Sequence, residues 1–317
     1  MMGMKGKALM KVVMLLAVLA AVVVGCGGGG SSSSTDLSDA DFTVGSKDFT
    51  EQQNLGYITL LALEDAGATV EDQVGLAGTN ATRQALEQGN IDMYWEYTGT
   101  IWITHLGHTD PIPNSQKQYE AAAKEDLQKN DLKLLEPAKF NNTYALAIRQ
   151  EEQKKLGVEK LSDLKQLVEE NPDEASVCIE SEFRSRDDGL PGLEKAYGFE
   201  FPQDNISLFD TGVIYNRTDK GEPCNFGEVF TTDGRIAGLG LYPLKDDKNL
   251  FPKYNPALEV KKSTYKQYGE QLDKIFTPIA QALDAKTMQE LNTKVDVEGI
   301  PPEDVAEQWL EKEGFIG

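Results

Sequence analysis

The sequence predicts an α/β protein made of two lobes with a helical C-terminal region. The chain has 317 residues, enough to bury a large core and, at this size, usually to divide into two domains. Hydrophobic residues make up 40% of it and aromatic residues 8%, which is typical of a folded globular protein. From Asp41 onward strand-like and helix-like segments alternate. This alternation is typical of mostly parallel sheets covered by helices.

The first lobe begins with an expected strand at residues 42–45. A helix should follow from Thr50 to about Ala66, because Leu55, Ile58 and Leu61 share one face and Gly67 provides a stop. The further elements expected in this part are strands at 69–74, 91–95 and 144–148 and helices at 78–86 and 117–129.

The second block has the same alternation, and Ser162 is placed to cap its first helix. The expected helices are 163–169 and 190–197, and the expected strands are 176–179, 206–209, 213–215 and 229–231. Residues 265–312 are expected to be helical in three pieces, broken at Pro278, at Gly299 and at Pro301-Pro302.

The composition excludes several classes of function. Acidic residues outnumber basic ones 52 to 31, a formal net charge of −21, so a nucleic-acid partner is disfavoured. The only histidines are His105 and His108, which argues against a histidine-based triad or a histidine-rich metal centre. The chain contains no phosphate-binding loop, nucleophile elbow, H-E-x-x-H or EF-hand motif. We therefore expect no catalytic residues, no metal site and no bound cofactor.

Residues 1–25 have the pattern of a secretory signal peptide, in which three lysines precede an apolar run too short for a good membrane span. The run ends Val23-Val24-Gly25-Cys26, which resembles the lipobox of bacterial lipoproteins, where the cysteine is lipidated. An ordinary signal peptide with a chance cysteine is the alternative. Residues 26–40 are then the lipidated Cys26 and a Gly/Ser tether. We expect an extracytoplasmic protein anchored by lipid to the outer face of the cell membrane.

Two further cysteines, Cys178 and Cys224, remain once Cys26 is assigned to lipidation. In an oxidising compartment such a pair is expected to form a disulfide. The alternative is that both are reduced and buried as small hydrophobic residues.

Polar turn residues recur beside tyrosines or at strand ends. The segments are Gly45-Ser46-Lys47-Asp48-Phe49-Thr50-Glu51-Gln52, Gly78-Thr79-Asn80, Tyr94-Trp95-Glu96-Tyr97-Thr98-Gly99-Thr100, Asn141-Asn142-Thr143-Tyr144 and Gly212-Val213-Ile214-Tyr215. In α/β sheets ligands bind at the carboxyl ends of strands, so Lys47 and Thr79 are candidate contacts. Tyrosine faces attract a quaternary ammonium group, which donates no hydrogen bond. Alternatively, each tyrosine is a half-buried core residue with a satisfied hydroxyl.

Four longer segments point to one family. GSKDFTEQ at 45–52, IDMYWEYTGT at 91–100, TTDGRI at 231–236 and LKDDKNLFPKY at 244–254 occur in the order found there. Together they resemble the substrate-binding proteins of osmoprotectant ABC transporters, which take up glycine betaine, choline, carnitine and related quaternary ammonium compounds. The similarity extends from Phe42 to the C-terminus.

The resemblance implies a periplasmic-binding-protein fold: two α/β lobes joined by two crossing strands and closing on the ligand like a trap. Lobe one would comprise residues 41–144 plus 240–317, and lobe two residues 145–239. The closed protein would dock on a membrane permease whose associated subunits hydrolyse ATP. A monomer is the usual state in this family.

The resemblance also implies the site residues. The family's cage tyrosines correspond to Tyr97, Tyr144 and Tyr215. The implied polar contacts are Thr100, Gln52 and Arg186, the last two at the ligand carboxylate. A fourth cage tyrosine usually follows the TDGRI segment, where this chain has Leu239 and the nearest tyrosine is Tyr242. Either Tyr242 or a tryptophan such as Trp95 substitutes, or the cage has three walls and binds more weakly or accepts a bulkier ligand.

The expected function is the extracytoplasmic capture of glycine betaine or a related quaternary ammonium osmoprotectant for an ABC importer. Choline, carnitine or a trimethylated histidine derivative is the alternative ligand. An extracytoplasmic enzyme is a remote alternative, because the sequence shows no plausible nucleophile–base pair. A sensor lobe serving a signalling partner is a further alternative, although the sequence shows no second functional segment.

Overall fold

The computed structural model describes residues 35–317. The predicted signal peptide, the predicted lipidation site Cys26 and the greater part of the tether lie outside the described residues. Within the described part, no helix combines the length and the hydrophobicity needed to cross a bilayer.

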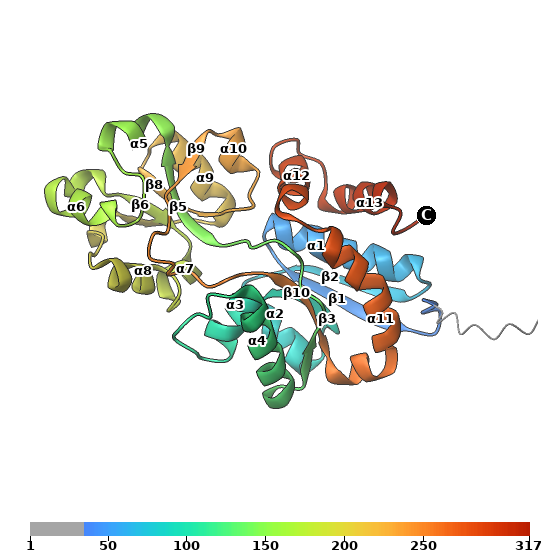
Figure 1. Cartoon of the computed structure of the whole chain (residues 1–317). Coiled ribbons are helices and arrows are strands. Elements are labelled where there is room, and N and C mark those ends of the chain that lie inside the picture. Colours follow the sequence, from blue (N-terminus) through green and yellow to red (C-terminus); the bar gives the residue numbers. More distant parts are fainter. Residues whose placement is uncertain (1–34) are drawn as a thin grey trace, which may run out of the picture. The chain divides into compact units, whose positions relative to one another are not determined.

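The first sheet has the strand order β2-β1-β3-β10-β4 (Figure 1). Its strands are β1 (Asp41–Lys47), β2 (Thr69–Leu76), β3 (Met93–Tyr97), β4 (Leu132–Leu134) and β10 (Pro256–Lys261). Strand β1 is parallel to β2 and β3, whereas β10 is antiparallel to β3 and β4. The sheet is therefore mixed rather than mostly parallel, because its β10 strand arrives from the second lobe.

The helices of this lobe come from both its N-terminal and its C-terminal segments. They are α1 (Thr50–Asp65), α2 (Thr79–Gln88), α3 (Thr98–Thr100) with the π-helical turn Ile101–His105, α4 (Ser115–Lys129), α11 (Lys262–Ala282), α12 (Ala285–Asp296) and α13 (Pro302–Glu313). One hydrophobic core joins the strands to α1 and α11, with Leu55, Trp95 and Phe276 fully buried within it.

The break predicted at Gly299 and Pro301-Pro302 separates α12 from α13, but the break predicted at Pro278 lies elsewhere. Pro278 lies inside α11, which continues to Ala282. The break falls instead before α12, where the Asp284 side chain accepts a hydrogen bond of 2.8 Å from the Thr287 N–H. An aspartate N-cap of this kind favours the start of a new helix at this position, whereas Pro278 is accommodated within the preceding one.

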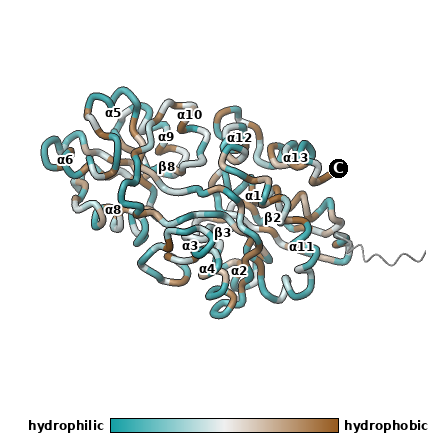
Figure 2. Tube along the Cα trace, viewed as in Figure 1, coloured by the Kyte–Doolittle hydropathy of each residue, from teal (hydrophilic) through white to brown (hydrophobic). Residues whose placement is uncertain are grey.

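The second sheet has the order β7-β6-β8-β5-β9. Its strands are β5 (Tyr144–Arg149), β6 (Val177–Ile179), β7 (Ile206–Leu208), β8 (Phe226–Phe230) and β9 (Leu241–Pro243). The accompanying helices are α5 (Gln150–Leu156), α6 (Asp163–Glu170), α7 (Ser181–Ser185), α8 (Leu190–Tyr197), α9 (Thr211–Lys220) and α10 (Arg235–Gly238). Figure 2 shows that α5 and α6 are largely hydrophilic, as expected for helices that cover a sheet and face water.

Residues 213–215, predicted as a strand, lie instead in helix α9. Ile214 and Thr218, four residues apart, are both fully buried, and Gly221 ends the helix in the left-handed conformation. A run as short as Val-Ile-Tyr is too brief for its periodicity to distinguish a strand from a helix, which explains why a strand was predicted here.

The chain passes between the two sheets twice, before β5 and before β10. Strand β9 pairs with β5, and the Leu244 N–H donates to the Leu146 carbonyl at 2.8 Å. Residues 241–244 therefore belong with the second sheet, and the return to lobe one predicted at residue 240 lies several residues further on. Tyr144, placed at the end of lobe one, is the first residue of β5.

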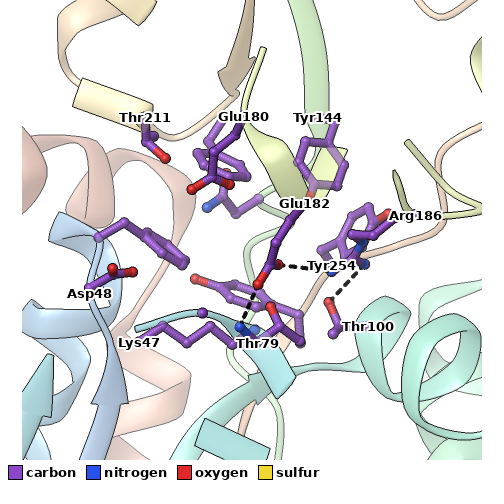
Figure 3. Close-up of a pocket in the computed structure, with 15 residues that line it drawn as sticks. Lys47, Asp48, Thr79, Thr100, Tyr144, Glu180, Glu182, Arg186, Thr211 and Tyr254 are labelled. Carbon is purple, nitrogen blue, oxygen red and sulfur yellow. Dashed lines mark hydrogen bonds and ion pairs between the residues drawn. The ribbon is translucent and has the colours of Figure 1, made fainter. Parts of the chain in front are cut away.

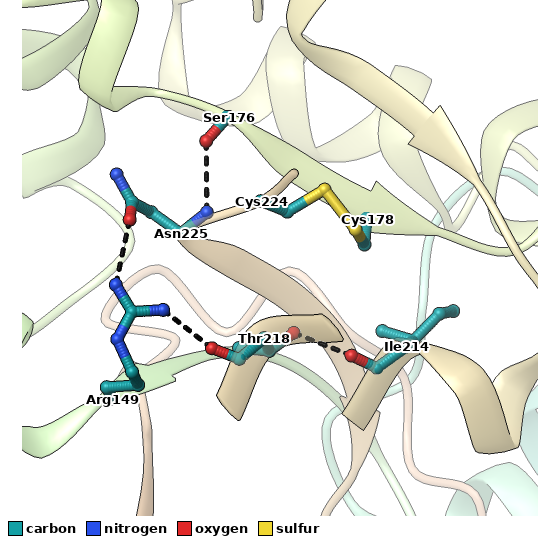
Figure 4. Close-up of a disulfide and its surroundings, with 7 residues drawn as sticks. All are labelled: Arg149, Ser176, Cys178, Ile214, Thr218, Cys224 and Asn225. Atoms are coloured by element: carbon teal, nitrogen blue, oxygen red, sulfur yellow. Dashed lines mark hydrogen bonds between the residues drawn. A yellow bond between two sulfur atoms is a disulfide. The ribbon is translucent and has the colours of Figure 1, made fainter. Parts of the chain in front are cut away.

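Cys178 in β6 and Cys224 just before β8 form a disulfide in the second lobe (Figure 4). Both cysteines are fully buried, and they pack against Ile214 of α9. Beside the bridge, the Asn225 N–H donates to the Ser176 hydroxyl at 3.0 Å. The disulfide therefore links β6 to the segment that enters its neighbour β8, beneath the helix that packs on them.

Reduction of this disulfide should destabilise the second lobe. Because the cross-link closes a loop with a sequence separation of 46 residues, chain-entropy arguments predict a loss of about 4 kcal/mol in the free energy of unfolding. Urea unfolding of the oxidised and the reduced protein measures this loss. The double variant C178A/C224A is the control and should not respond to reductant. Equal stability of the oxidised and reduced wild type would contradict the prediction.

Candidate functional site

A pocket lies between the two lobes and takes its walls from both of them (Figure 3). The lining residues of the first lobe are Lys47, Asp48, Phe49, Gly78, Thr79, Tyr97 and Thr100. The second lobe contributes Tyr144, Glu180, Glu182, Arg186, Thr211 and Phe230, and the crossing segments contribute Asn142 and Tyr254.

The fold places these side chains by bringing strand ends together. Lys47 ends β1, Tyr97 ends β3 and Phe230 ends β8, while Glu180 follows β6 directly. Thr79 is the first residue of α2, and its backbone N–H points to Glu182, another residue of the pocket lining. The site therefore lies at the carboxyl ends of strands, the usual position for ligands in α/β proteins.

Five aromatic rings line the pocket: Phe49, Tyr97, Tyr144, Phe230 and Tyr254. Phe49 stacks on Phe230 with ring centroids 5.3 Å apart, and Phe230 lies 5.2 Å from Tyr144. Tyr254 meets Tyr144 edge-on at 5.5 Å. The rings form a continuous aromatic wall, and aromatic faces of this kind attract organic cations.

Six of the predicted contact residues line this pocket, namely Lys47, Thr79, Tyr97, Thr100, Tyr144 and Arg186. Tyr215 does not. It lies on α9, fully buried, and its hydroxyl accepts a hydrogen bond of 2.9 Å from the Phe230 N–H. Its ring packs with Ala145 and Val229 beneath the sheet. Tyr215, which the resemblance implies as a cage residue, therefore lies outside the lining of this pocket, on a helix where a strand was expected.

Gln52 and Tyr242 also lie outside the pocket lining. The Gln52 amide donates to the Trp95 carbonyl at 2.9 Å, and its oxygen accepts from the Lys47 N–H at 3.3 Å. Gln52 thus connects the end of β1 to β3 through these two hydrogen bonds. Tyr242 pairs with Ile148 in the second sheet and packs in the core of that lobe.

Neither candidate replaces the tyrosine expected at Leu239. Trp95 is 1% exposed in the first-lobe core, and its indole N–H donates to Thr59 at 2.8 Å. Three further aromatic residues, Tyr254, Phe49 and Phe230, line the pocket and were not among the expected contacts. Tyr254 ends the LKDDKNLFPKY segment, so the segment was identified but its tyrosine was not assigned to the site.

The two cations of the pocket are each paired with a carboxylate. The Lys47 ammonium lies 2.7 Å from buried Glu96. The Arg186 guanidinium makes two hydrogen bonds of 2.7 Å to Asp188, whose other partner is the Tyr254 hydroxyl at 2.7 Å. Burial alone would raise the pKa of Asp188, but the hydrogen bonds and charge of Arg186 bring it below its usual value.

Carboxylates also line the pocket directly. Burial, with the nearby charges of Glu182, Asp48 and Asp210, raises the pKa of Glu180 to about 7. Behind it, Glu228 accepts a hydrogen bond of 2.8 Å from the Glu180 N–H, and burial raises the Glu228 pKa to about 8. This side of the pocket is therefore acidic, and its charge depends on pH near neutrality.

A further buried carboxylate, Glu51, connects the pocket to the lobe boundary. It accepts hydrogen bonds from the Tyr97 hydroxyl at 2.8 Å and the Asn142 amide at 2.9 Å. Thr232 of the second lobe and Asn292 of α12 donate to its other oxygen. Burial raises the Glu51 pKa to about 6, although these four hydrogen bonds act in the opposite direction.

Replacing Glu51 should change how stability depends on pH. The folded pKa of about 6 exceeds the ordinary value of 4.5, so the folded state binds this proton more tightly. The stabilisation from protonation is complete below pH 4.5 and is lost as pH rises through 6. From pH 4.5 to 7, wild type should therefore lose about 2 kcal/mol more unfolding free energy than E51Q.

Urea unfolding at the two pH values measures this difference. The variant E64Q, at an exposed position of the same helix, is the control and should follow wild type. Parallel pH profiles for wild type and E51Q would contradict the assignment of this titration to Glu51.

Comparison with known proteins identifies close matches over most of the chain. Residues 40–312 match the family described as the substrate binding domain of the ABC-type glycine betaine transport system. The chain is 37% identical over 278 residues to the glycine-betaine-binding protein of Pseudomonas aeruginosa, covering 86% of this chain and 88% of that one. It is 35% identical to the ergothioneine transport permease/ergothioneine binding protein EgtU of Helicobacter pylori, covering 88% of this chain and 49% of that one.

The solved structure of apo YehZ from Escherichia coli matches with a TM-score of 0.64 and 35% identity, covering 87% of this chain and 99% of that chain. This match confirms the predicted fold of two α/β lobes. The mixed sheets described above are those of the periplasmic-binding-protein type.

Proposed function

Because the chain belongs to the family of substrate-binding domains of ABC-type glycine betaine transport systems, we propose that it captures glycine betaine or a related quaternary ammonium osmoprotectant. It is a substrate-binding protein of an ABC importer, and its partners are a small-molecule ligand and a permease. The family is not one of enzymes, so the enzyme alternative is not supported.

The observation that carries this proposal is the aromatic wall of Phe49, Tyr97, Tyr144, Phe230 and Tyr254. A quaternary ammonium group has no N–H to donate, so ordinary polar side chains cannot hold it. Ring faces can, through their negative quadrupole, at about 2 kcal/mol or more where water is excluded. The wall includes rings from both lobes, which suits a ligand that is enclosed between them.

Polar groups around the rings would orient the rest of the ligand. Thr79, Thr100, Arg186 and Lys47 line the pocket and are the proposed polar contacts. A ligand that touches both lobes favours their closed arrangement, with bending in the two crossing segments. The closed protein then presents the ligand to the permease, and the ATPase subunits that drive import are separate chains.

The expected setting is the outer face of the cell membrane, with lipid on Cys26 as the anchor and the protein acting as a monomer. The resemblance of residues 23–26 to a lipobox supports the anchor. An extracytoplasmic location agrees with the family and with the disulfide of the second lobe.

A trimethylated histidine derivative is the second candidate ligand. The similarity to EgtU, a protein named for ergothioneine binding, favours it. Glu180 lines the pocket and could accept a hydrogen bond from a ring N–H of such a ligand, which glycine betaine lacks.

Loss of one ring should weaken ligand binding. The variant Y144L removes a ring at the centre of the aromatic wall, and we expect it to reduce the affinity for the bound quaternary ammonium compound about 30-fold, corresponding to about 2 kcal/mol. Isothermal titration of the purified protein with glycine betaine, choline and ergothioneine measures the affinities.

The matched control is Y242L, which removes a tyrosine of the same lobe outside the pocket and should leave the affinity within about twofold. Absence of binding by all three compounds would overturn the proposed function. Equal effects of Y144L and Y242L would instead overturn the placement of the aromatic wall.

A further inference from the structure

Glu182 reaches across the pocket from the second lobe to the first (Figure 3). It lies on α7, and its carboxylate accepts a hydrogen bond of 2.7 Å from the backbone N–H of Thr79. Thr79 begins α2, a helix of 10 residues, whose N-terminal N–H groups carry partial positive charge. The carboxylate of Glu182 therefore occupies a place suited to an anion.

The backbone is shaped to accept this carboxylate closely. Gly78 precedes Thr79 with φ of +83°, a conformation that favours glycine. A Cβ atom at this position would lie 2.9 Å from the nearer Glu182 oxygen, closer than real Cβ atoms approach a neighbour. Glycine at position 78 thus suits both the backbone conformation and the close approach of the Glu182 carboxylate, which would have to shift to make room for a larger residue.

The guanidinium of Arg186 is already matched by carboxylates of the protein. Asp188 takes its Nε and one Nη2 hydrogen bond, both at 2.7 Å. Its Nη1 lies 3.9 Å from the second oxygen of Glu182. Glu182 therefore stands between the helix N-terminus on one side and the guanidinium on the other, the two groups of the pocket best suited to a ligand carboxylate.

The other charges of the pocket favour a cation. Lys47 is paired with Glu96. Asp48 and Glu180 line the pocket, and neither forms an ion pair with any residue in the range 35–317. The carboxylates at the pocket surface thus exceed the cations available to balance them, so a ligand with net positive charge would gain Coulomb energy there.

From this arrangement we propose that Glu182 selects quaternary ammonium ligands of net positive charge, such as choline-type amino alcohols, over zwitterionic betaines. This proposal rests on the proposed function. The carboxylate of Glu182 occupies the position that the carboxylate of a bound betaine would otherwise take, beside the Thr79 N–H and the Arg186 guanidinium. A betaine must displace Glu182 from Thr79 and Arg186, whereas a cationic ligand leaves these contacts in place and is attracted by the same charge.

The variant E182A tests the proposal, because it removes the competing carboxylate and leaves the Thr79 N–H and Arg186 Nη1 for the ligand. Wild type should bind choline about tenfold more tightly than glycine betaine. In E182A the affinity for glycine betaine should rise at least about fivefold and that for choline should fall about tenfold. Isothermal titration at pH 8, where Glu180 is mostly ionised, measures both ligands on the same protein.

The matched control is E180Q, which removes a carboxylate from the same pocket wall without freeing a helix N-terminus. This variant should bind choline more weakly than wild type does and should show no gain in affinity for glycine betaine. Thermal unfolding of each variant verifies that it is folded; Glu182 is half-buried, and its side chain is 32% exposed.

The proposal is overturned if wild type prefers glycine betaine to choline, or if E182A gains no affinity for glycine betaine. Failure of the proposed function gives a different result. In that case choline, glycine betaine and the minimal probe tetramethylammonium bind neither wild type nor E182A.

Discussion

The carboxylate of Glu51 is the point at which the two lobes, the chain crossing and the pocket meet. Its donors come from strand β3, from the first crossing segment, from the loop after β8 and from helix α12. A buried carboxylate is costly, and hydrogen bonds from several segments make it tolerable. Because these donors are far apart in the sequence, one side chain fixes where each segment lies relative to the others.

This arrangement reaches the pocket through Tyr97. Its hydroxyl is held by Glu51, and its ring forms part of the aromatic wall. Asn142, on the crossing segment, shares the same carboxylate oxygen and also lines the pocket. The geometry of the ring wall and the geometry of the crossing therefore depend on a common set of hydrogen bonds. A change of lobe angle must alter both together.

Much of this structure could be predicted from the sequence, and the exceptions have physical causes. Long helices such as α1 and α4 were located within a few residues, because a helical pattern sustained over several turns is distinctive. The family resemblance supplied Tyr97, Tyr144 and Arg186, which lie in the pocket. Some short elements were not predicted correctly: the three residues of β9 carry too little pattern to show which sheet they join.

The differences between the expected and the observed pocket lining arise from tertiary placement. Tyr215 is implied by the family resemblance and Tyr254 ends a resembling segment, yet one lies beneath the sheet and the other in the pocket. Local sequence does not distinguish these outcomes, since each tyrosine is buried and has a satisfied hydroxyl. Only the crossing path of residues 244–255, which returns the chain beside Tyr144, decides the matter.

The bridge between Cys178 and Cys224 has a consequence for biogenesis. In the reducing cytoplasm the thiols stay apart, so the second lobe lacks its cross-link and its unfolded chain keeps its full conformational freedom. A secretory translocon that threads extended polypeptide benefits from a substrate whose folding is incomplete at that stage. Oxidation beyond the membrane then makes maturation directional, since the lobe that carries Glu180 and Glu182 acquires its full stability only on the side where the ligand is captured.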